Sequence, residues 1–215
     1  MRTGTKSAET RWAENAIEEA CRRAEQWYRA LPQFLDRVVL GSVTGFKHPA
    51  LISEQDCVIH FARFLNDAGV PWDAIHHQVS VSHWLFDHPH PAATAKGATK
   101  WRVDLALLDS EKFRTAKLPA REPGFQFDSC LEFAYLSDFW TLPGVHPFGA
   151  PAKGRDKVLV DVEKIARYLS GGACRTGYVI VFEECDWGFS PTFVSDAEAS
   201  QGCRVRFVRG YPTTA

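Results

Sequence analysis

The chain has 215 residues, of which 45% are apolar and 24% are charged, and its formal net charge is −1. This length and composition are typical of one globular domain with a substantial core, and they exclude a largely disordered chain. The near-zero charge argues against a protein that coats nucleic acid non-specifically, since such proteins are usually strongly basic.

The N-terminal segment predicts a long amphipathic helix. Residues 7–31 place tryptophan, alanine and leucine at helical spacing with charged residues between them, and Pro32 then breaks the pattern. We therefore divide the chain into an N-terminal helical arm, 1–50, and a larger domain, 51–215. The N-terminus lacks the apolar core of a signal peptide, and no run approaches the roughly 20 apolar residues of a membrane-spanning helix. We expect a cytoplasmic protein with no membrane partner.

The larger domain begins with a predicted helix and a predicted strand. Ser53 can cap the helix EQDCVIHFARFLNDA, which ends at Gly69 and carries Glu54 in its first turn. Its apolar residues form one stripe, as expected of a helix that covers a core. The next segment, AIHHQVSVSHWLF, alternates in the manner of a strand.

Two further predicted strands each carry an acid in the middle of an apolar run. They are WRVDLALLD, with Asp104, and FDSCLEFAYL, with Glu132. A basic segment of about residues 110–126 separates them, and a Pro- and Gly-rich loop from Ser137 to about Arg155 follows.

The C-terminal part predicts a helix followed by two strands. The helix is DKVLVDVEKIARYLS, and the strands are GYVIVFEE and CRVRFVR. A helix between the third and fourth strands of the domain fits a right-handed crossover between parallel neighbours. The expected fold is α/β with a mixed central sheet, an N-terminal helical extension and an additional C-terminal strand.

A shared cation would explain the two acids inside strands. An ionised carboxylate in a buried strand is costly unless another charge compensates it, and Mg²⁺ or Mn²⁺ prefers carboxylate oxygens. Asp104 and Glu132, on consecutive strands, are therefore candidate ligands. The alternative is that each acid forms a salt bridge with a nearby basic residue such as Arg102.

These residues resemble the PD-(D/E)XK, or restriction-endonuclease-like, nucleases over about residues 54–184. The resemblance lies in the order helix, three strands, helix, strand and in three acids. It implies an αβββαβ core and a site with one or two Mg²⁺ (or Mn²⁺) ions. It also implies that Asp104, Glu132, the backbone carbonyl of Phe133 and Glu54 are metal ligands.

The sequence departs from the family pattern at Ala134, where an E-x-K motif has its lysine. The resemblance implies that this lysine activates the attacking water and offsets charge on the phosphate, which a methyl group cannot do. Three explanations remain open. Lys164 or Lys157, on the following helix, takes over the role; the fold has lost cleavage and kept binding; or Ala134 is an engineered replacement.

Basic residues are concentrated in several separated stretches and predict a nucleic-acid-binding surface. The candidates are Lys100, Arg102, Lys112, Arg114, Lys117, Lys153, Arg155 and Lys157, with Arg204, Arg206 and Arg209 as a further set. Solvated charge on loops is the alternative explanation.

The predicted function is metal-dependent hydrolysis of phosphodiester bonds in nucleic acid, with DNA favoured. Asp104, Glu132, Lys164 and the position of Ala134 are the candidate catalytic residues. The alternative is a catalytically silent subunit of nuclease fold that binds nucleic acid or assembles with a partner, as a homodimer or in a larger complex. A third hypothesis is a structural or regulatory domain that binds no nucleic acid.

Overall fold

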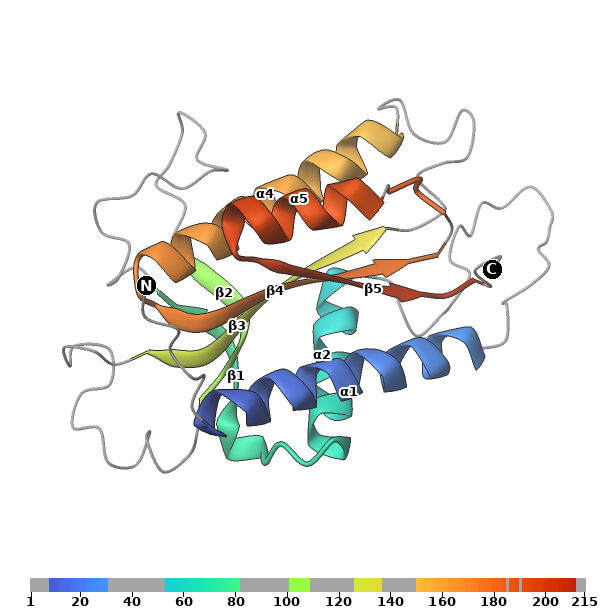
Figure 1. Cartoon of the computed structure of the whole chain (residues 1–215). Helices are drawn as coiled ribbons and strands as arrows, with labels where there is room; N and C mark the ends of the chain where they lie inside the picture. The colour runs from blue at the N-terminus through green and yellow to red at the C-terminus, as the bar shows by residue number, and fades with distance from the viewer. Residues whose placement is uncertain are drawn as a thin grey trace.

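The computed structural model describes residues 8–30, 53–81, 101–108, 126–136, 150–184, 186–189 and 191–211. Within these ranges the elements are α1 (Ala8–Ala30), α2 (Glu54–Asp67), the short 3-10 helix η1 (Trp72–Ala74), β1 (Ile75–Ser80), β2 (Arg102–Leu107), β3 (Phe127–Leu136), α4 (Ala150–Ser170), β4 (Cys174–Glu183), α5 (Pro191–Gln201) and β5 (Arg204–Arg209) (Figure 1). None of the helices in these ranges is long and apolar enough to cross a lipid bilayer.

The five described strands form one mixed sheet in the order β1-β2-β3-β4-β5. The first three strands are antiparallel neighbours, whereas β4 runs parallel to both β3 and β5. Helix α4 connects β3 to its parallel neighbour β4, as the spacing of the sequence predicts. The expected α/β class, the mixed sheet and the additional C-terminal strand are therefore confirmed.

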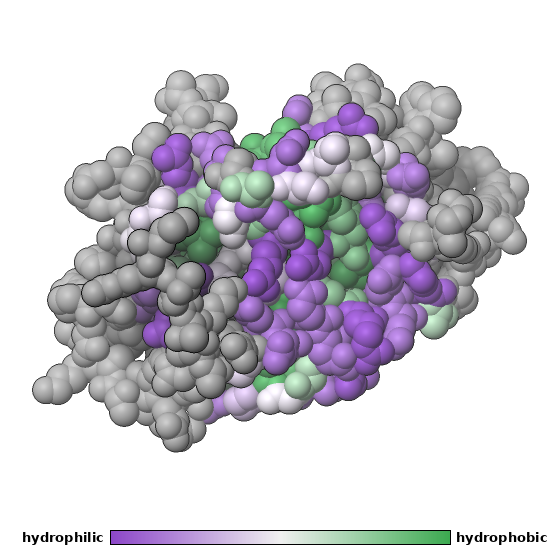
Figure 2. Space-filling view, viewed as in Figure 1, coloured by the Kyte–Doolittle hydropathy of each residue, from purple (hydrophilic) through white to green (hydrophobic). Residues whose placement is uncertain are grey.

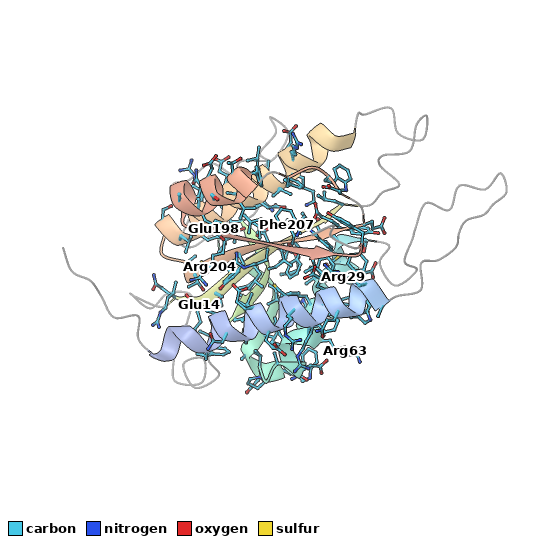
Figure 3. All side chains as sticks on the ribbon, turned by 45° about the vertical axis from the view of Figure 1, so that its right-hand side comes forward. Glu14, Arg29, Arg63, Glu198, Arg204 and Phe207 are labelled. Carbon is cyan, nitrogen blue, oxygen red and sulfur yellow. The ribbon has the colours of Figure 1, made fainter. Side chains whose placement is uncertain are left out.

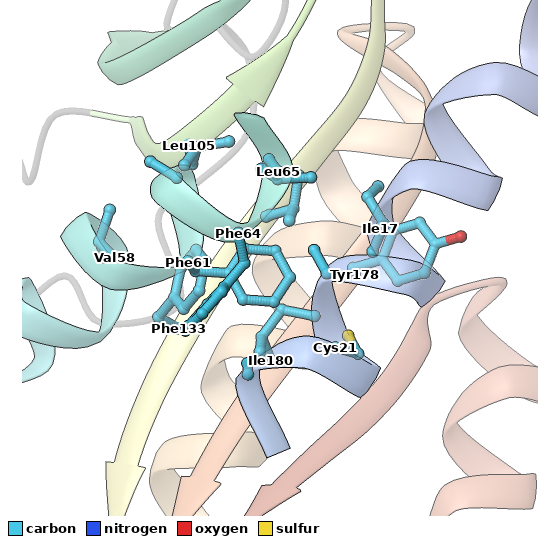
Figure 4. Close-up of a cluster of buried hydrophobic side chains, with 14 of the residues drawn as sticks. Ile17, Cys21, Val58, Phe61, Phe64, Leu65, Leu105, Phe133, Tyr178 and Ile180 are labelled. Carbon is cyan, nitrogen blue, oxygen red and sulfur yellow. The ribbon is translucent and has the colours of Figure 1, made fainter. Parts of the chain in front are cut away.

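Helices cover both faces of this sheet (Figure 1). On one face, α1 and α2 bury apolar side chains against β2, β3 and β4, and we call this group the α1/α2 cluster. Figure 4 shows its centre, where Phe61 and Phe64 from α2 lie beside Phe133 of the sheet. On the other face, the α4 cluster joins Val158 and Ile165 to the opposite side of the same strands. The sheet therefore has a hydrophobic layer on each side, with its central strands buried.

The ends of α2 agree with the sequence signals. The Ser53 hydroxyl accepts a hydrogen bond from the Asp56 backbone N–H, and the Asp56 carboxylate accepts one from the Ser53 N–H, which completes a capping box. Gly69 follows the helix with a φ of 95°, a conformation that side chains with a Cβ rarely adopt.

The start of one helix and the presence of another differ from the sequence prediction. Helix α4 begins at Ala150, whereas residues up to about Arg155 were expected in a loop. Proline is tolerated in a first helical turn, so Pro151 does not interrupt the helix, and Gly154 allows Trp187 to pack directly on it. Helix α5 was not predicted, because PTFVSDAEASQ has little apolar periodicity; it begins at a proline and packs beside β5.

Helix α1 is integrated with the rest of the described structure. Ala13, Ile17, Ala24 and Tyr28 of α1 are buried in the α1/α2 cluster. Figure 2 shows the face with α1 and the β5 edge, where hydrophilic residues surround visible hydrophobic ones. The expected domain boundary at residue 50 lies outside the described residues, as does the predicted continuation of β1 beyond Val81.

Candidate active site

Asp104 lies on β2 at the point where regular pairing with β3 ends. The last pair in the register of these strands joins Leu105 to Leu131. Beyond that pair, the backbone N–H of Phe133 donates to Asp104 Oδ2 at 3.0 Å, and Gln78 Nε2 donates to Oδ1 at 3.1 Å. The carboxylate thus takes the place of a strand carbonyl, which satisfies the Phe133 N–H and fixes the orientation of the side chain.

Glu132 is fully buried on β3 and faces α4. Its Oε1 lies 2.7 Å from the Tyr168 hydroxyl, and its Oε2 accepts a hydrogen bond from Lys164 Nζ at 2.7 Å. Burial and the nearby Asp104 charge raise the pKa of Glu132 to about 8, although Lys164 opposes the rise. Glu132 therefore binds a proton or another positive charge more readily than an exposed glutamate does.

Tyr168 connects Glu132 to the backbone of β2. Its hydroxyl is 2.7 Å from Glu132 Oε1 and 3.0 Å from the carbonyl oxygen of Arg102. A hydroxyl has one proton to donate, so the Glu132 carboxylate and the Arg102 carbonyl oxygen share it. Tyr168 therefore ties the orientation of Glu132 to the backbone of β2.

Helix α4 presents four polar side chains to this site. Lys157, Asp161, Lys164 and Tyr168 are spaced by four, three and four positions, which places them along one side of the helix. Lys164 Nζ also donates to Asp161 Oδ1 at 2.9 Å, so this lysine bridges two buried carboxylates. The helix therefore brings both positive and negative charge to the acids of the sheet.

Lys157 links α4 to the first turn of α2 and to β3. Its Nζ lies 2.5 Å from Glu54 Oε2, 3.3 Å from Asp161 Oδ2 and 3.4 Å from the carbonyl oxygen of Phe133. The side chain of Lys157 is 38% exposed, whereas that of Lys164 is 18% exposed. Of the two lysine side chains, that of Lys157 is therefore the more exposed.

The site carries more negative than positive charge. Glu54, Asp104, Glu132 and Asp161 face Lys157 and Lys164, an excess of two negative charges if all six groups are ionised. Burial raises the pKa of Asp104 and of Glu54, whose negative neighbours add to the effect. Burial alone would lower the pKa of each lysine, but the surrounding carboxylates outweigh it and raise both. Such a site favours the uptake of additional positive charge.

Ala134 lies two residues beyond Glu132 on β3, with its side chain in the α4 cluster and fully buried. Its backbone follows the Phe133 carbonyl to which Lys157 donates. The structure therefore brings together Glu54, Asp104, Glu132, Phe133 and Lys164, the residues that the sequence assigns to the site. It also adds Lys157, which the sequence assigned chiefly to nucleic-acid binding.

Three residues at the site were missed as participants by sequence reasoning. Asp161 resembles half of a surface ion pair in the sequence but is 2% exposed. Tyr168 could have been found from the spacing of Lys157, Lys164 and Tyr168 on one helix side. No sequence signal points to Gln78, because its role depends on the strand opposite.

The predicted basic surface is described only in part. Arg102 is exposed, and Arg155 is exposed and donates to the carbonyl oxygen of Gly188 at 2.9 Å. The set on β5 is paired with acids, because Arg204 contacts Glu14, Arg206 contacts Glu18 and Glu198, and Arg209 contacts Glu183. Lys100, Lys112, Arg114 and Lys117, and the side chain of Lys153, lie outside the described residues.

The donor atoms of the site fit a hard divalent cation in kind. Carboxylate and carbonyl oxygens from Asp104, Glu132, Glu54 and Phe133 are the ligand types that Mg²⁺ and Mn²⁺ prefer. Within the described residues, no group of three or more His, Cys, Asp or Glu side chains is arranged to hold a metal ion as it stands. Mg²⁺ commonly uses only one or two carboxylates and completes its shell with water and substrate phosphate.

Comparison of the chain with protein-family models, with curated proteins and with solved structures finds no match.

Proposed function

We propose that this chain is a metal-dependent nuclease of the PD-(D/E)XK type whose lysine comes from α4 instead of from β3. The observation that carries the proposal is that two lysine ammonium groups from α4 reach β3, one at the Glu132 carboxylate and one at the Phe133 carbonyl oxygen. Lys164 contacts Glu132, and Lys157 contacts the carbonyl oxygen that precedes Ala134. Positive charge is thus available where the strand lysine of the resemblance is missing.

The order of elements supports the same proposal. From α2 to β4 the chain runs helix, three antiparallel strands, crossover helix and parallel strand, which is the αβββαβ arrangement that the resemblance implies. Asp104 and Glu132 lie on adjacent strands, and the charge of Asp104 contributes to the raised pKa of Glu132. Fold alone does not define function, so the side chains of the site decide between the candidates.

Asp104, Glu132, Glu54 and the carbonyl of Phe133 would hold Mg²⁺ or Mn²⁺. When bound, the ion would polarise the scissile phosphate and make water a stronger nucleophile. Lys157, the more exposed lysine, would offset negative charge that builds on the phosphate. Lys164 and Tyr168 would hold Glu132 in one orientation.

We further propose DNA as the substrate and a cytoplasmic location. The basic stretches between the strands would contact the phosphate backbone, which positions a substrate without reading its sequence. Assembly as a homodimer or with a partner protein would be compatible with this function.

One observation favours the second candidate, a catalytically silent subunit that binds nucleic acid. All four oxygen atoms of the Asp104 and Glu132 carboxylates have a hydrogen-bond partner within the chain. Two carboxylates whose oxygens are satisfied by Gln78, the Phe133 N–H, Lys164 and Tyr168 remain in place without a cation. The two candidates therefore differ in chemistry and share a fold.

The test is cleavage of plasmid DNA and of DNA and RNA oligonucleotides with Mg²⁺ or Mn²⁺, with EDTA as the negative control. We expect metal-dependent cutting that Asp104→Asn abolishes and that Lys157→Met lowers by about 10²-fold to 10³-fold. Arg167→Met is the matched control, because Arg167 is on α4 and pairs with Glu163. Its cleavage rate should equal that of the unchanged chain.

A relocation variant tests the origin of the lysine. Lys157→Ala combined with Ala134→Lys moves the ammonium group from the helix to the strand, and recovered cutting would show that the two positions are equivalent. If neither the unchanged chain nor Ala134→Lys cuts any substrate, the silent subunit is favoured. If neither shifts the mobility of nucleic acid even at low salt, both nucleic-acid functions are excluded.

A further inference from the structure

Gln78, the β1 residue across from Asp104 on β2, has an unusual backbone conformation. It lies within β1, and it is the one non-glycine residue of the described ranges with a positive φ, 49°. Glutamine adopts this region rarely, since its Cβ crowds the backbone there. The side chain of Gln78 is exposed, so no burial of apolar surface compensates the strain.

The pairing of β1 and β2 is interrupted at the same position. His77 pairs with Leu105, and Val79 pairs with Val103, but the pair between them, Gln78 and Asp104, is missing from the register. The register is the same on both sides of the gap, so no residue has been inserted. The disturbance is therefore confined to Gln78 and Asp104.

Both strands also change the face that they present to each cluster. In a regular strand, residues two or four positions apart lie on one face. Ile75 nevertheless belongs to the α1/α2 cluster and Val79 packs against the α4 cluster. On β2, Leu105 likewise belongs to the α1/α2 cluster, whereas Val103 belongs to the α4 cluster. The strands therefore invert their pleat across the Gln78 and Asp104 pair.

This inversion gives Asp104 its position between the faces. Its Oδ2 accepts from the Phe133 N–H on one side, and its Oδ1 accepts from Gln78 Nε2 on the other. The side-chain hydrogen bond replaces the missing backbone pair. Asparagine or glycine would accept the positive φ more readily, whereas glutamine has the additional reach to Asp104.

We infer that Gln78 is a positioning residue, which holds the Asp104 carboxylate in the orientation that the reaction requires. The inference rests on the proposed nuclease function. Strained backbone conformations persist where the surrounding structure enforces them, and they are concentrated at functional sites. Gln78 acts through Asp104 and is not itself assigned a contact with the substrate.

The experiment compares Gln78→Ala and Gln78→Gly with the unchanged chain in a cleavage assay with Mn²⁺. Both variants lose the amide, and a misdirected carboxylate should lower kcat by about tenfold or more while KM changes less than about threefold. His77→Ala, a change at the exposed neighbouring residue of β1, is the matched control and should keep kcat. Equal kcat in all three variants and the unchanged chain would overturn the inference.

Thermal unfolding separates positioning from a general loss of structure. Gln78→Gly relieves the strain, so its midpoint should lie above that of Gln78→Ala, although both lose kcat equally. A kcat that instead follows the midpoint would show a merely structural role and overturn the inference. The midpoint shift of Gln78→Ala should also become smaller when Asp104→Ala is already present, because the two side chains bond each other.

The outcomes distinguish this inference from the proposed function. If the unchanged chain cuts and the Gln78 variants cut equally well, the nuclease function stands and the positioning role fails. If the unchanged chain cuts nothing, the nuclease function fails. Coupled midpoint shifts would then show that the contact between Gln78 and Asp104 only stabilises the fold, which also overturns the catalytic positioning.

Discussion

At the scale of single residues, the hydroxyl of Tyr168 joins a buried carboxyl to the backbone of β2. Tyr168→Phe removes the only hydroxyl between Glu132 Oε1 and the Arg102 carbonyl among the described residues. Because buried polar groups lose their partner, we expect the free energy of unfolding to fall by about 1–3 kcal/mol. Urea denaturation measures this loss.

Tyr135→Phe is the matched control for the effect on activity. Tyr135 is on β3, the strand that also carries Glu132, and its hydroxyl donates to Glu184. The substitution removes this hydroxyl. We expect both tyrosine variants to lose stability, but only Tyr168→Phe to lower kcat, since only Tyr168 holds Glu132. Equal kcat for the two variants would contradict the assigned role of Tyr168.

The raised pKa of Glu183 predicts a pH dependence of stability, and Glu183 is not part of the candidate active site. Burial raises its pKa from 4.5 to about 7, although Arg209 and Tyr211 oppose the rise. The folded state therefore binds the proton more tightly than the unfolded state between about pH 4.5 and 7. The stabilisation is complete below pH 4.5 and is lost as the pH rises to about 7.

Glu183→Gln removes this titration. Relative to the variant, the unchanged chain should lose at most about 3 kcal/mol of unfolding free energy between pH 4.5 and 7, with no further relative change above pH 8. Urea denaturation at a series of pH values measures the difference. A difference that is constant, or that grows in favour of the unchanged chain with rising pH, would refute the prediction.

Residue identity alone predicted part of the site. Asp104 and Glu132 were found because an acid in an apolar strand requires compensation, and Glu54 because the family resemblance assigned it. The pattern could not show which lysine reaches them, since Lys157 and Lys164 lie on the same helix side and both contact acids. That choice depends on how deeply α4 packs, which is a tertiary property.

At the scale of elements, Gly177 sets the distance between α4 and β4. A Cβ at this position would collide with Ile165 Cγ2 on the helix. Gly177→Ala should therefore destabilise the chain by about 1–3 kcal/mol through overpacking. Ile165→Leu removes the colliding methyl at similar volume, so the double variant should regain part of the loss in urea denaturation. A fully additive double variant would show that the helix is not held by this contact.

The elements that sequence predicted best were those with strong periodicity. Helix α2 has a capping residue and an apolar stripe, and its observed bounds agree with them. Helix α5 lacks such a stripe and is held by its neighbours, because Phe193 packs against Phe189 beside β5. The early turns of α4 depend on Trp187, more than thirty positions away, filling the space over Gly154. Contacts this distant in sequence leave no local pattern.

At the scale of the whole molecule, Arg206 links the two helical layers at β5, which is an edge strand of the described sheet. The guanidinium contacts Glu18 of α1 at 2.9 Å and Glu198 of α5 at 2.7 Å, and it donates to the carbonyl oxygen of Val205 at 2.9 Å. In Figure 3, Glu198 lies above β5, and Arg204 and Glu14 make a second link below it. Strand β5 is the edge of the described sheet, and charged residues on edge strands prevent pairing with other chains.

Arg206→Val tests this protection. The change removes two ion pairs and leaves a β-branched residue on the edge, so we expect a loss of about 1–2 kcal/mol in unfolding free energy and a concentration-dependent rise in mass. Light scattering after size-exclusion chromatography measures the mass, and urea denaturation measures the stability. Arg29→Ala is the matched control, since its ion pair with Glu25 lies within α1. If both variants elute at the mass of the unchanged chain at every concentration, Arg206 links the two layers without guarding the edge.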